Sequence, residues 1–145
     1  VTLAQIYTDE QRIMERVAEQ GGAEIGEEVR AHVRSRLACV RRWLEAYAPE
    51  TVKFAILRDP SRVKLGEGEK EILAAFAAVL EAVPWTPESI HNGVYACAEQ
   101  LGIKAPAVFR AAYRAFIGAE RGPRLGYFLS SLDRTFVLER LRLRR

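Results

Sequence analysis

Apolar residues recur at intervals of three and four along most of the chain, which is the spacing of one face of an α-helix. The longest such run predicts a helix over about residues 23–48. Its apolar members are Ile25, Val29, Val33, Leu37, Val40, Leu44 and Tyr47. Before it, Thr8 or Asp9 can cap a helix that continues to about Glu19. The arginines on the other faces of the long run are typical of a solvated helix surface.

The clearest start signal is the sequence Trp85-Thr86-Pro87-Glu88. Thr86 can act as the N-cap and Pro87 suits the first helical position, so a helix should begin there and end at Gly102. Trp85 should pack against the first turn. Four more helices are expected, over about 67–83, over 105–117, from about Arg124, and after a cap at Asp133.

These segments together predict an all-α fold, a helical bundle or cage of about six to seven helices. The turn Arg58-Asp59-Pro60-Ser61 is the best boundary between subdomains. We therefore expect an N-terminal helical subdomain on the stem side, residues 1–65. The C-terminal helical subdomain, residues 66–145, should carry the binding site. Only the alternation of Val52, Phe54 and Ile56 indicates a short extended piece.

The composition is that of an ordinary globular protein, because 49% of the 145 residues are hydrophobic and 28% are charged. Cys39 and Cys97 lie within apolar helical patterns and are expected to be buried. Two cysteines are too few for a disulfide framework or a zinc motif, which fits a reducing cytoplasm. No apolar run approaches the roughly 18 residues of a membrane span. The N-terminus has no signal-like segment, so secretion is not expected. Because the chain begins at Val1 and not at Met, we expect a piece of a longer protein.

Positive charge is concentrated towards the C-terminus. Residues 103–145 hold ten Lys or Arg against three acidic residues, a balance of +7, whereas the net charge of the whole chain is +3. Such an asymmetry indicates a polyanionic partner, with nucleic acid favoured over anionic lipid. A solvated basic tail remains the alternative explanation.

No constellation for catalysis appears. There is no P-loop, no Gly-x-Gly-x-x-Gly motif after a strand, and no metal-ligand motif around the two histidines, His32 and His91. His91 is typical of a structural or solvent-facing histidine. We therefore expect no catalytic residue, metal site or cofactor in this chain, and a function in recognition.

The best candidate site is the turn Glu120–Gly126. The backbone freedom of Gly122 and the fixed φ of Pro123 suit a tight turn, and a helix should follow it. Arg121 and Arg124 in the turn can contact phosphates or stack on bases, and Leu125 can contact a base. Arg114 is added from its charge and its position on the preceding helix. An ordinary helix connection with solvated arginines is the alternative.

Several segments, in order along residues 36–143, resemble the anticodon-binding end of class I lysyl-tRNA synthetases. They are Ala38–Leu44, Tyr47–Glu50, Val52–Phe54, Trp85–Asn92, Ala112–Gly118, Glu120–Leu129, Phe136-Val137 and Glu139–Leu141. The same region of glutamyl-tRNA synthetases is less similar, because the Trp85 and Glu120–Gly126 segments follow the lysyl pattern. Residues 1–35 match only loosely.

The resemblance implies an α-helical cage that binds the anticodon stem-loop of a lysine tRNA. It also implies a role near anticodon bases for Gly122, Pro123 and Leu125. The same role is carried over to Arg124, although the family residue at that position varies in kind. The family's Rossmann domain, with its His-x-Gly-His and Lys-Met-Ser-Lys-Ser signatures, is missing from the sequence. That domain would use ATP with Mg and would be this chain's partner in a full-length, cytoplasmic lysine–tRNA ligase, so this chain alone should not activate lysine. We expect a monomer.

Two other functions remain open from the sequence. The chain would be a free-standing tRNA-binding paralogue if no catalytic domain accompanied it. It would be a protein–protein interaction module if the fold had been kept and RNA binding lost. Binding through several arginines should weaken steeply with salt, whereas binding through an apolar protein interface should not, so salt dependence distinguishes the last of these.

Overall fold

The computed structural model describes residues 1–143, and over that range the chain is helical, with eight α-helices, one 3₁₀ turn and no strand. The expected all-α fold is therefore confirmed. Six of the helices have seven or more residues. The chain forms two compact units, Val1–Ala55 and the part from Ile56 onward. This division lies before the Arg58–Ser61 turn, and the turn belongs to the second unit.

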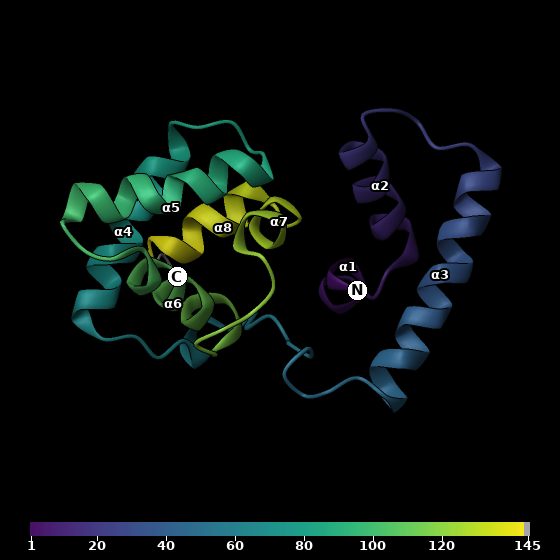
Figure 1. Cartoon of the computed structure of the whole chain (residues 1–145), viewed down its shortest axis with the longest axis horizontal. Coiled ribbons are helices and arrows are strands. Elements are labelled where there is room, and N and C mark those ends of the chain that lie inside the picture. Colours follow the sequence, from purple (N-terminus) through teal and green to yellow (C-terminus); the bar gives the residue numbers. More distant parts are fainter. Residues whose placement is uncertain (144–145) are drawn as a thin grey trace. The chain divides into compact units, whose positions relative to one another are not determined.

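The first unit holds α1 (Thr2–Ile6), α2 (Glu10–Gly21) and α3 (Glu27–Ala46) (Figure 1). Asp9 caps α2 by accepting a hydrogen bond from the backbone N–H of Gln11 at 2.9 Å. The small core of this unit consists of Ile6, Tyr7, Ile13, Met14, Leu37 and Ala48. The extended piece expected near Phe54 is irregular, and the Gln5 side chain holds it by bonding the Val52 carbonyl and the Phe54 N–H.

Helix α3 departs from the expectation in two ways. It begins at Glu27 rather than near residue 23, because Gly26 is its N-cap. Its apolar stripe is also only partly covered: Val29 is 47% exposed and Tyr47 is 77% exposed. Cys39 on the same helix is exposed, so the prediction that both cysteines are buried was wrong for Cys39 and right for Cys97. A periodic stripe shows which face is apolar, but the number of helices packed on that face decides how much of it is buried.

The second unit packs five helices around one core (Figure 1). They are α4 (Glu67–Glu81), α5 (Pro87–Leu101), α6 (Ala105–Ile117), α7 (Leu125–Ser130) and α8 (Arg134–Leu141). Helix α4 packs against α5, α6 and α8, and α5 also packs against α6 and α7. The fully buried side chains include Leu73, Phe76, Leu80, Ile90, Val94, Val108, Phe116, Phe128, Leu129 and Leu141.

Local capping explains several helix limits of this unit. Thr86 Oγ1 accepts a hydrogen bond from the Ser89 N–H at 3.2 Å, and Asp133 Oδ1 accepts one from the Phe136 N–H at 3.1 Å. Helices α5 and α6 end at glycines in the left-handed conformation, Gly102 and Gly118. The predicted starts of α5 and α8 and the predicted limits of α6 are confirmed. Leu101, at the end of α5, is nevertheless 39% exposed.

A buried arginine secures the start of the second unit. Arg140 is 5% exposed and donates to the carbonyls of Leu57 (2.5 Å), Ala115 (3.0 Å) and Arg58 (3.0 Å). Burial lowers the pKa of this guanidinium from its ordinary value, an effect that the nearby Asp59 opposes. The segment before the 3₁₀ turn (Pro60–Arg62) is thereby fastened to the end of α6 and to α8.

Candidate nucleic-acid interface

The turn singled out by the sequence connects α6 to α7 and is attached to α6 by a side chain. The Tyr113 hydroxyl donates a hydrogen bond to the Pro123 carbonyl at 2.6 Å. Tyr113 is 9% exposed, and burial raises the pKa of its hydroxyl, which keeps that proton in place as a donor. The helix that follows begins at Leu125 with Arg124 as its N-cap, close to the expected start. Helix α7 has only six residues, so its N-terminus is too weak a dipole to attract an anion by itself. The positive charge of the turn comes from Arg121 and Arg124.

Gly122 is required for a different reason from the one expected. Its φ is not positive, since the glycines with positive φ in the described chain are Gly22, Gly102 and Gly118. A Cβ at Gly122 would lie 2.7 Å from Ile117 Cδ1 and 2.9 Å from Tyr113 Cδ1. The glycine therefore allows the turn to lie directly on the side chains of α6. The sequence analysis had predicted instead that Gly122 supplies a special backbone conformation.

Gly126 allows a second close approach. A Cβ at this position would lie 2.2 Å from the carbonyl oxygen of Pro87, a backbone atom that a rotamer change cannot move. Helix α7 therefore lies directly against the first turn of α5. The Thr86-Pro87 start signal and the turn, far apart in the sequence, meet at this point.

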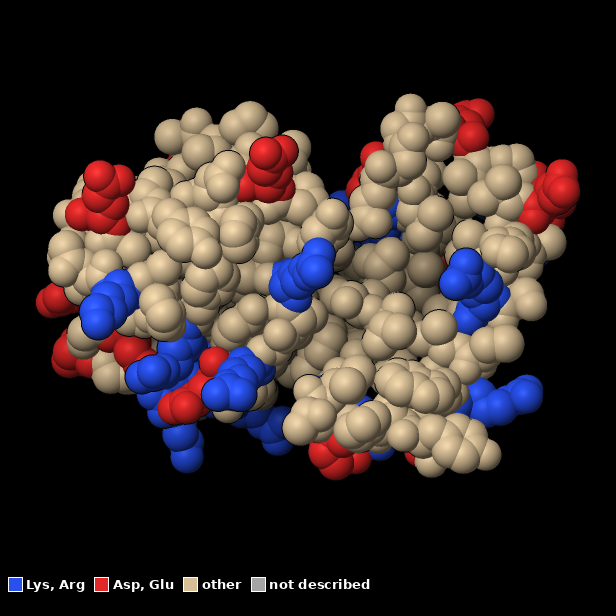
Figure 2. Space-filling view, viewed as in Figure 1, with Lys and Arg blue, Asp and Glu red and all other residues tan. Residues whose placement is uncertain are grey.

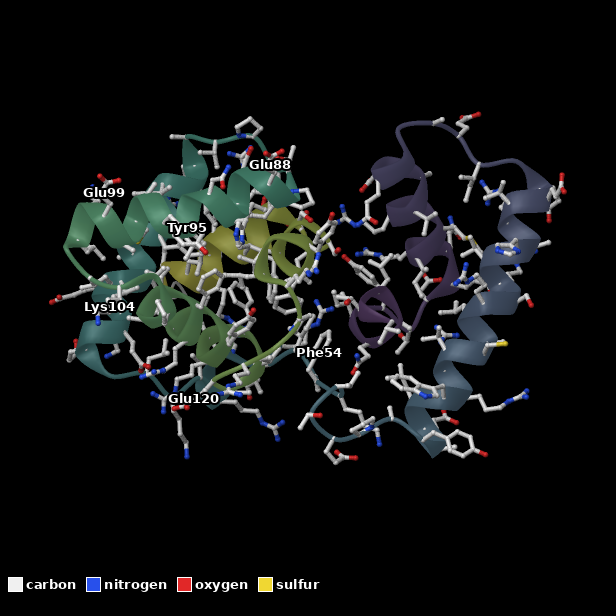
Figure 3. The ribbon with its side chains drawn as sticks, viewed as in Figure 1. Phe54, Glu88, Tyr95, Glu99, Lys104 and Glu120 are labelled. Atoms are coloured by element: carbon white, nitrogen blue, oxygen red, sulfur yellow. The ribbon has the colours of Figure 1, made fainter. Side chains whose placement is uncertain are left out.

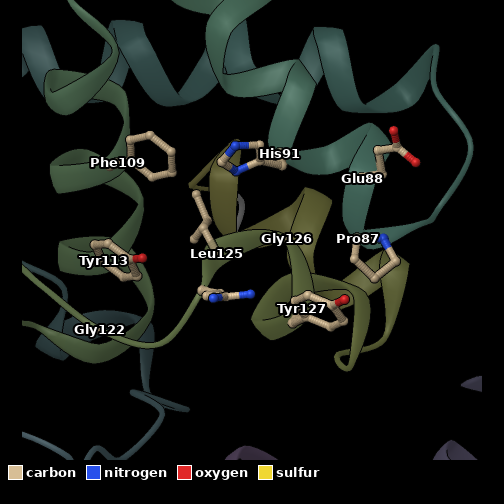
Figure 4. Close-up of a pocket in the computed structure, with 10 residues that line it drawn as sticks. Pro87, Glu88, His91, Phe109, Tyr113, Gly122, Leu125, Gly126 and Tyr127 are labelled. Carbon is tan, nitrogen blue, oxygen red and sulfur yellow. The ribbon is translucent and has the colours of Figure 1, made fainter.

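A cavity of about 720 Å³ lies where these elements meet. Its lining comes from α5, α6, the turn and α7: Pro87, Glu88, His91, Phe109, Tyr113, Gly122, Arg124, Leu125, Gly126 and Tyr127. Figure 4 shows the rings of Phe109 and Tyr113 on one side, with Pro87 and Glu88 on the other. Leu125 and His91 lie between these two sides.

The aromatic lining extends to the surface of the domain. The His91 ring contacts Tyr95 edge-on, with 5.3 Å between ring centroids, and lies 6.0 Å from the Phe109 ring. Tyr95 also contacts Phe109 edge-on at 6.2 Å. Tyr95 is 51% exposed and Tyr127 is 54% exposed, so these two rings are not needed to fill the core. Rings at such positions are available to a partner.

The structure separates the predicted site residues into four groups, of which Arg114 forms the last. Gly122, Pro123 and Arg124 lie on the turn, with Gly122 and Arg124 exposed and both lining the cavity. Leu125 is 1% exposed and reaches a partner only through the cavity. Arg121 is exposed in the turn but does not line the cavity.

Arg114 lies away from the cavity. It donates to Glu69 Oε1 at 2.8 Å, and Glu69 in turn caps α4 by accepting from the Gly66 N–H. Burial disfavours the Glu69 carboxylate, but the hydrogen bonds from Gly66 and Arg114 outweigh that effect and lower its pKa. Arg114 therefore holds α6 to the start of α4, and any contact with RNA would compete with this ion pair.

Charge is unevenly distributed over the second unit. Figure 3 shows Glu88 and Glu99 of α5 on one side and Lys104 on the other, towards Glu120, and Figure 2 shows most of the basic side chains of this unit gathered there with acidic ones among them. The basic side carries α6 and the segment that leads into the turn. The basic side chains that a polyanion could contact are therefore concentrated on this side of the unit.

Sequence reasoning missed the cavity itself. His91 was expected to be structural or solvent-facing. A single helix considered alone gives no sign that the rings of His91, Phe109 and Tyr113 lie beside the turn. Trp85 was assigned to packing; its ring lies under the guanidinium of Arg134 at 5.6 Å.

Among the described residues, no group of three or more His, Cys, Asp or Glu side chains is placed to hold a metal ion. No helix within residues 1–143 is long and apolar enough to cross a bilayer.

Comparison with known proteins identifies the class of this fold. A family model described as an anticodon binding domain matches residues 27–144, most of the chain. The chain belongs to this anticodon-binding domain family. The match covers all of α4–α8 and therefore the turn and the cavity.

Relatives of this anticodon-binding domain include lysine–tRNA ligases. The chain is 42% identical to the lysine–tRNA ligase of Thermoplasma acidophilum over 142 residues, which cover 98% of this chain and 27% of the ligase. It is 44% identical to that of Pyrococcus horikoshii over 112 residues, 77% of this chain and 21% of the relative. It is 39% identical to the lysine–tRNA ligase of Archaeoglobus fulgidus over 128 residues, which cover 87% of this chain and 25% of the ligase.

The chain thus spans about a quarter of the length of these relatives. The predicted resemblance to the anticodon-binding region of lysyl-tRNA synthetases is confirmed. It is also more extensive than expected, because the similarity to the Thermoplasma acidophilum ligase includes nearly all of residues 1–35, which had seemed to match only loosely.

Proposed function

We propose that this domain recognises the anticodon loop of a lysine tRNA as part of a lysine–tRNA ligase. The observation that carries the proposal is the match of the whole second unit to the anticodon-binding family, together with relatives that are lysine–tRNA ligases. In the full-length enzyme, a separate catalytic domain would bind ATP with Mg and form lysyl-tRNA. The domain would act there as a monomer in the cytoplasm and contribute no catalytic residue.

The turn Glu120–Gly126 is the proposed recognition element. Its exposed arginines, Arg121 and Arg124, would bind phosphates and fix the position of the loop, while its backbone would face base edges. The hydrogen bond from Tyr113 to Pro123 and the close contact of Gly122 with α6 hold that backbone in one conformation. A pre-formed turn loses little entropy on binding, which favours discrimination between loops.

The direct test is binding of this chain to a lysine-tRNA anticodon stem-loop, beside the same stem-loop with its anticodon bases changed. We expect tighter binding of the lysine loop and a strong decrease of affinity with salt. Equal affinity for both loops at every salt concentration would contradict anticodon recognition. Binding of a protein partner through an apolar interface, with no salt-sensitive RNA binding, would instead support an interaction module.

The arginines can be tested in the same assay. Each phosphate contact to single-stranded RNA contributes about 0.7 to the slope of log affinity against log salt. Arg121→Gln combined with Arg124→Gln should therefore reduce that slope by about 1.4 if each arginine binds one phosphate. Arg12→Gln, at an exposed position of α2, is the matched control and should leave the slope unchanged.

A further inference from the structure

We propose that a basic pocket beside the 3₁₀ turn binds a phosphate group. The pocket has a volume of about 560 Å³, and its lining comes from the segment 60–65, from α4 and from the C-terminal end of α8. The lining residues are Pro60, Val63, Lys64, Leu65, Lys70, Arg140 and Leu143. None of them lines the cavity beside the turn Glu120–Gly126, so this site is separate from the proposed recognition element.

The charge of the lining points to an anion. Lys64, Lys70 and Arg140 are its charged members, and no acidic residue is among the described ones. In the cavity beside the turn, by contrast, Glu88 accompanies Arg124. Three like charges around one concave surface repel each other, and a bound anion replaces this repulsion with attraction. The pocket is therefore suited to a negatively charged ligand.

Arg140 contributes a buried charge that no carboxylate of the described chain neutralises at close range. Its side chain donates to three backbone carbonyls, and within residues 1–143 no carboxylate lies within ion-pair distance of it. A guanidinium has five N–H donors, so two of them have no acceptor in that part of the chain. Because buried charges are normally paired, an anion in the pocket would supply the missing partner.

The two lysines are both available to such an anion. Lys64 is exposed and has no hydrogen bond or ion pair within residues 1–143. Lys70 pairs with Glu67 one turn earlier in α4, but the Glu67 side chain is 87% exposed, and an ion pair at the surface contributes little to stability. Lys70 can therefore exchange this carboxylate for a ligand. Lysine is a common phosphate binder because its ammonium is a compact charge on a flexible stem.

The number of cations and the apolar lining favour a phosphate ester over a simple carboxylate. A terminal phosphate has three acceptor oxygens and carries nearly two negative charges at neutral pH, which matches several cations at once. The pocket is also larger than a phosphate alone needs, and its volume lies within the roughly 300–1,000 Å³ of small-molecule sites. Val63, Leu65 and Leu143 can contact the organic part of the ester. A small phosphate ester and the backbone of an RNA share this chemistry.

The experiment uses inorganic phosphate as the probe. It is titrated into the ¹⁵N-labelled domain while sodium chloride keeps the ionic strength constant, and the amide signals of residues 63–65 and of Lys70 report binding in the pocket. Lys64→Gln combined with Lys70→Gln removes two of the three cations and leaves Arg140 in place. Lys104→Gln is the matched control, because Lys104 is exposed in the same unit and does not line the pocket. The amide spectrum of each variant also shows whether it is folded.

We expect the signals around the pocket to shift along a saturating curve in the wild-type domain and in Lys104→Gln. In the double variant the dissociation constant should rise at least tenfold, which is about the effect of one lost hydrogen bond to a charged group. Equal binding by all three proteins would overturn the proposal, as would shifts that do not saturate. Because the probe contains no anticodon, this result is independent of the proposed function.

A second titration, with lysine tRNA, identifies the source of the phosphate. If the pocket holds a backbone phosphate of the RNA, the double variant should reduce the slope of log affinity against log salt by about 0.7–0.9, the contribution of one phosphate contact. An unchanged slope, together with saturable binding of inorganic phosphate, would assign the pocket to a small phosphate ester.

Discussion

The hydroxyl of Tyr113 donates to the carbonyl oxygen of Pro123 at 2.6 Å, and this bond ties the turn Glu120–Gly126 to α6. Tyr113→Phe keeps the ring and removes the bond, so the turn should lose its fixed conformation. We expect the free energy of unfolding to fall by about 1 kcal/mol, and affinity for the lysine stem-loop to fall severalfold. Urea unfolding and stem-loop binding measure the two effects.

Tyr127→Phe is the control for that variant, because it removes the hydroxyl of an exposed tyrosine in the same region. Its unfolding free energy should stay within about 0.5 kcal/mol of wild type, as at most surface positions. If Tyr113→Phe behaved in the same way in both assays, the hydrogen bond would have no role in holding the turn.

The contact of Gly126 with Pro87 predicts a large effect from one methyl group. Gly126→Ala would place a Cβ 2.2 Å from the Pro87 carbonyl oxygen, so α7 would have to move away from α5. We expect a loss of about 1–3 kcal/mol in unfolding free energy, typical of overpacking, and weaker RNA binding. Gly68→Ala in α4 is the matched control, since nothing lies within 4 Å of its Cβ position, and its stability should be unchanged or higher.

The buried guanidinium of Arg140 should be essential for the stability of the second unit. Arg140→Met keeps an apolar stem and leaves the carbonyls of Leu57, Arg58 and Ala115 without this donor. At roughly 1 kcal/mol for each lost hydrogen bond, the unfolding free energy should fall by about 3 kcal/mol. Arg121→Met, at an exposed position, should change it by less than about 0.5 kcal/mol. Equal effects of the two substitutions would show that Arg140 does not fasten this segment.

The Glu69 carboxylate predicts an acid-sensitive contact between α4 and α6. Although burial alone would raise its pKa, the hydrogen bonds from Gly66 and Arg114 lower it below its ordinary value of 4.5. A lowered pKa in the folded state stabilises the fold above the unfolded-state value, and this contribution is lost as the pH falls through the folded-state pKa. Glu69→Gln should therefore reduce stability at pH 7 and flatten its decline below about pH 4.5. Unfolding measured from pH 7 to pH 3 tests this, with the exposed Glu71→Gln as control.

The two cysteines should differ sharply in reactivity. Cys97 is 0% exposed, and burial raises the pKa of its thiol, so the thiolate is both rare and inaccessible in the native state. Cys39 is exposed on α3. A thiol reagent should modify one cysteine per native chain and two in denaturant. Rapid modification of both native thiols would contradict the burial of Cys97.

Much of the local structure was predictable because its causes are local. The Thr86 cap and the Pro87 at the first helical position act within one turn of helix, and Asp133 acts in the same way on α8. Stop signals at Gly102 and Gly118 are equally local, since each ends its own helix. These features require no knowledge of the rest of the fold.

Exposure was predicted less well, because an apolar stripe does not reveal how much of it is covered. Tyr47 and Val29 follow the helical period of α3 yet remain exposed, and Cys39 is exposed on the same helix. In the second unit, five helices surround one core, and the periodic positions of α4 and α6 are mostly buried. The difference is the number of packing partners, which no single segment contains.

The sequence alone determined the helical class, most helix limits, the position of the turn and the family to which the domain belongs. Only the tertiary structure decided how the turn is held and what surrounds it. The partners of Gly122, Gly126 and Arg140, and the rings that face Leu125, come from helices distant in the chain. Helix caps depend on atoms a few residues apart, whereas a cavity depends on how whole helices pack, and that packing is fixed only when the core closes.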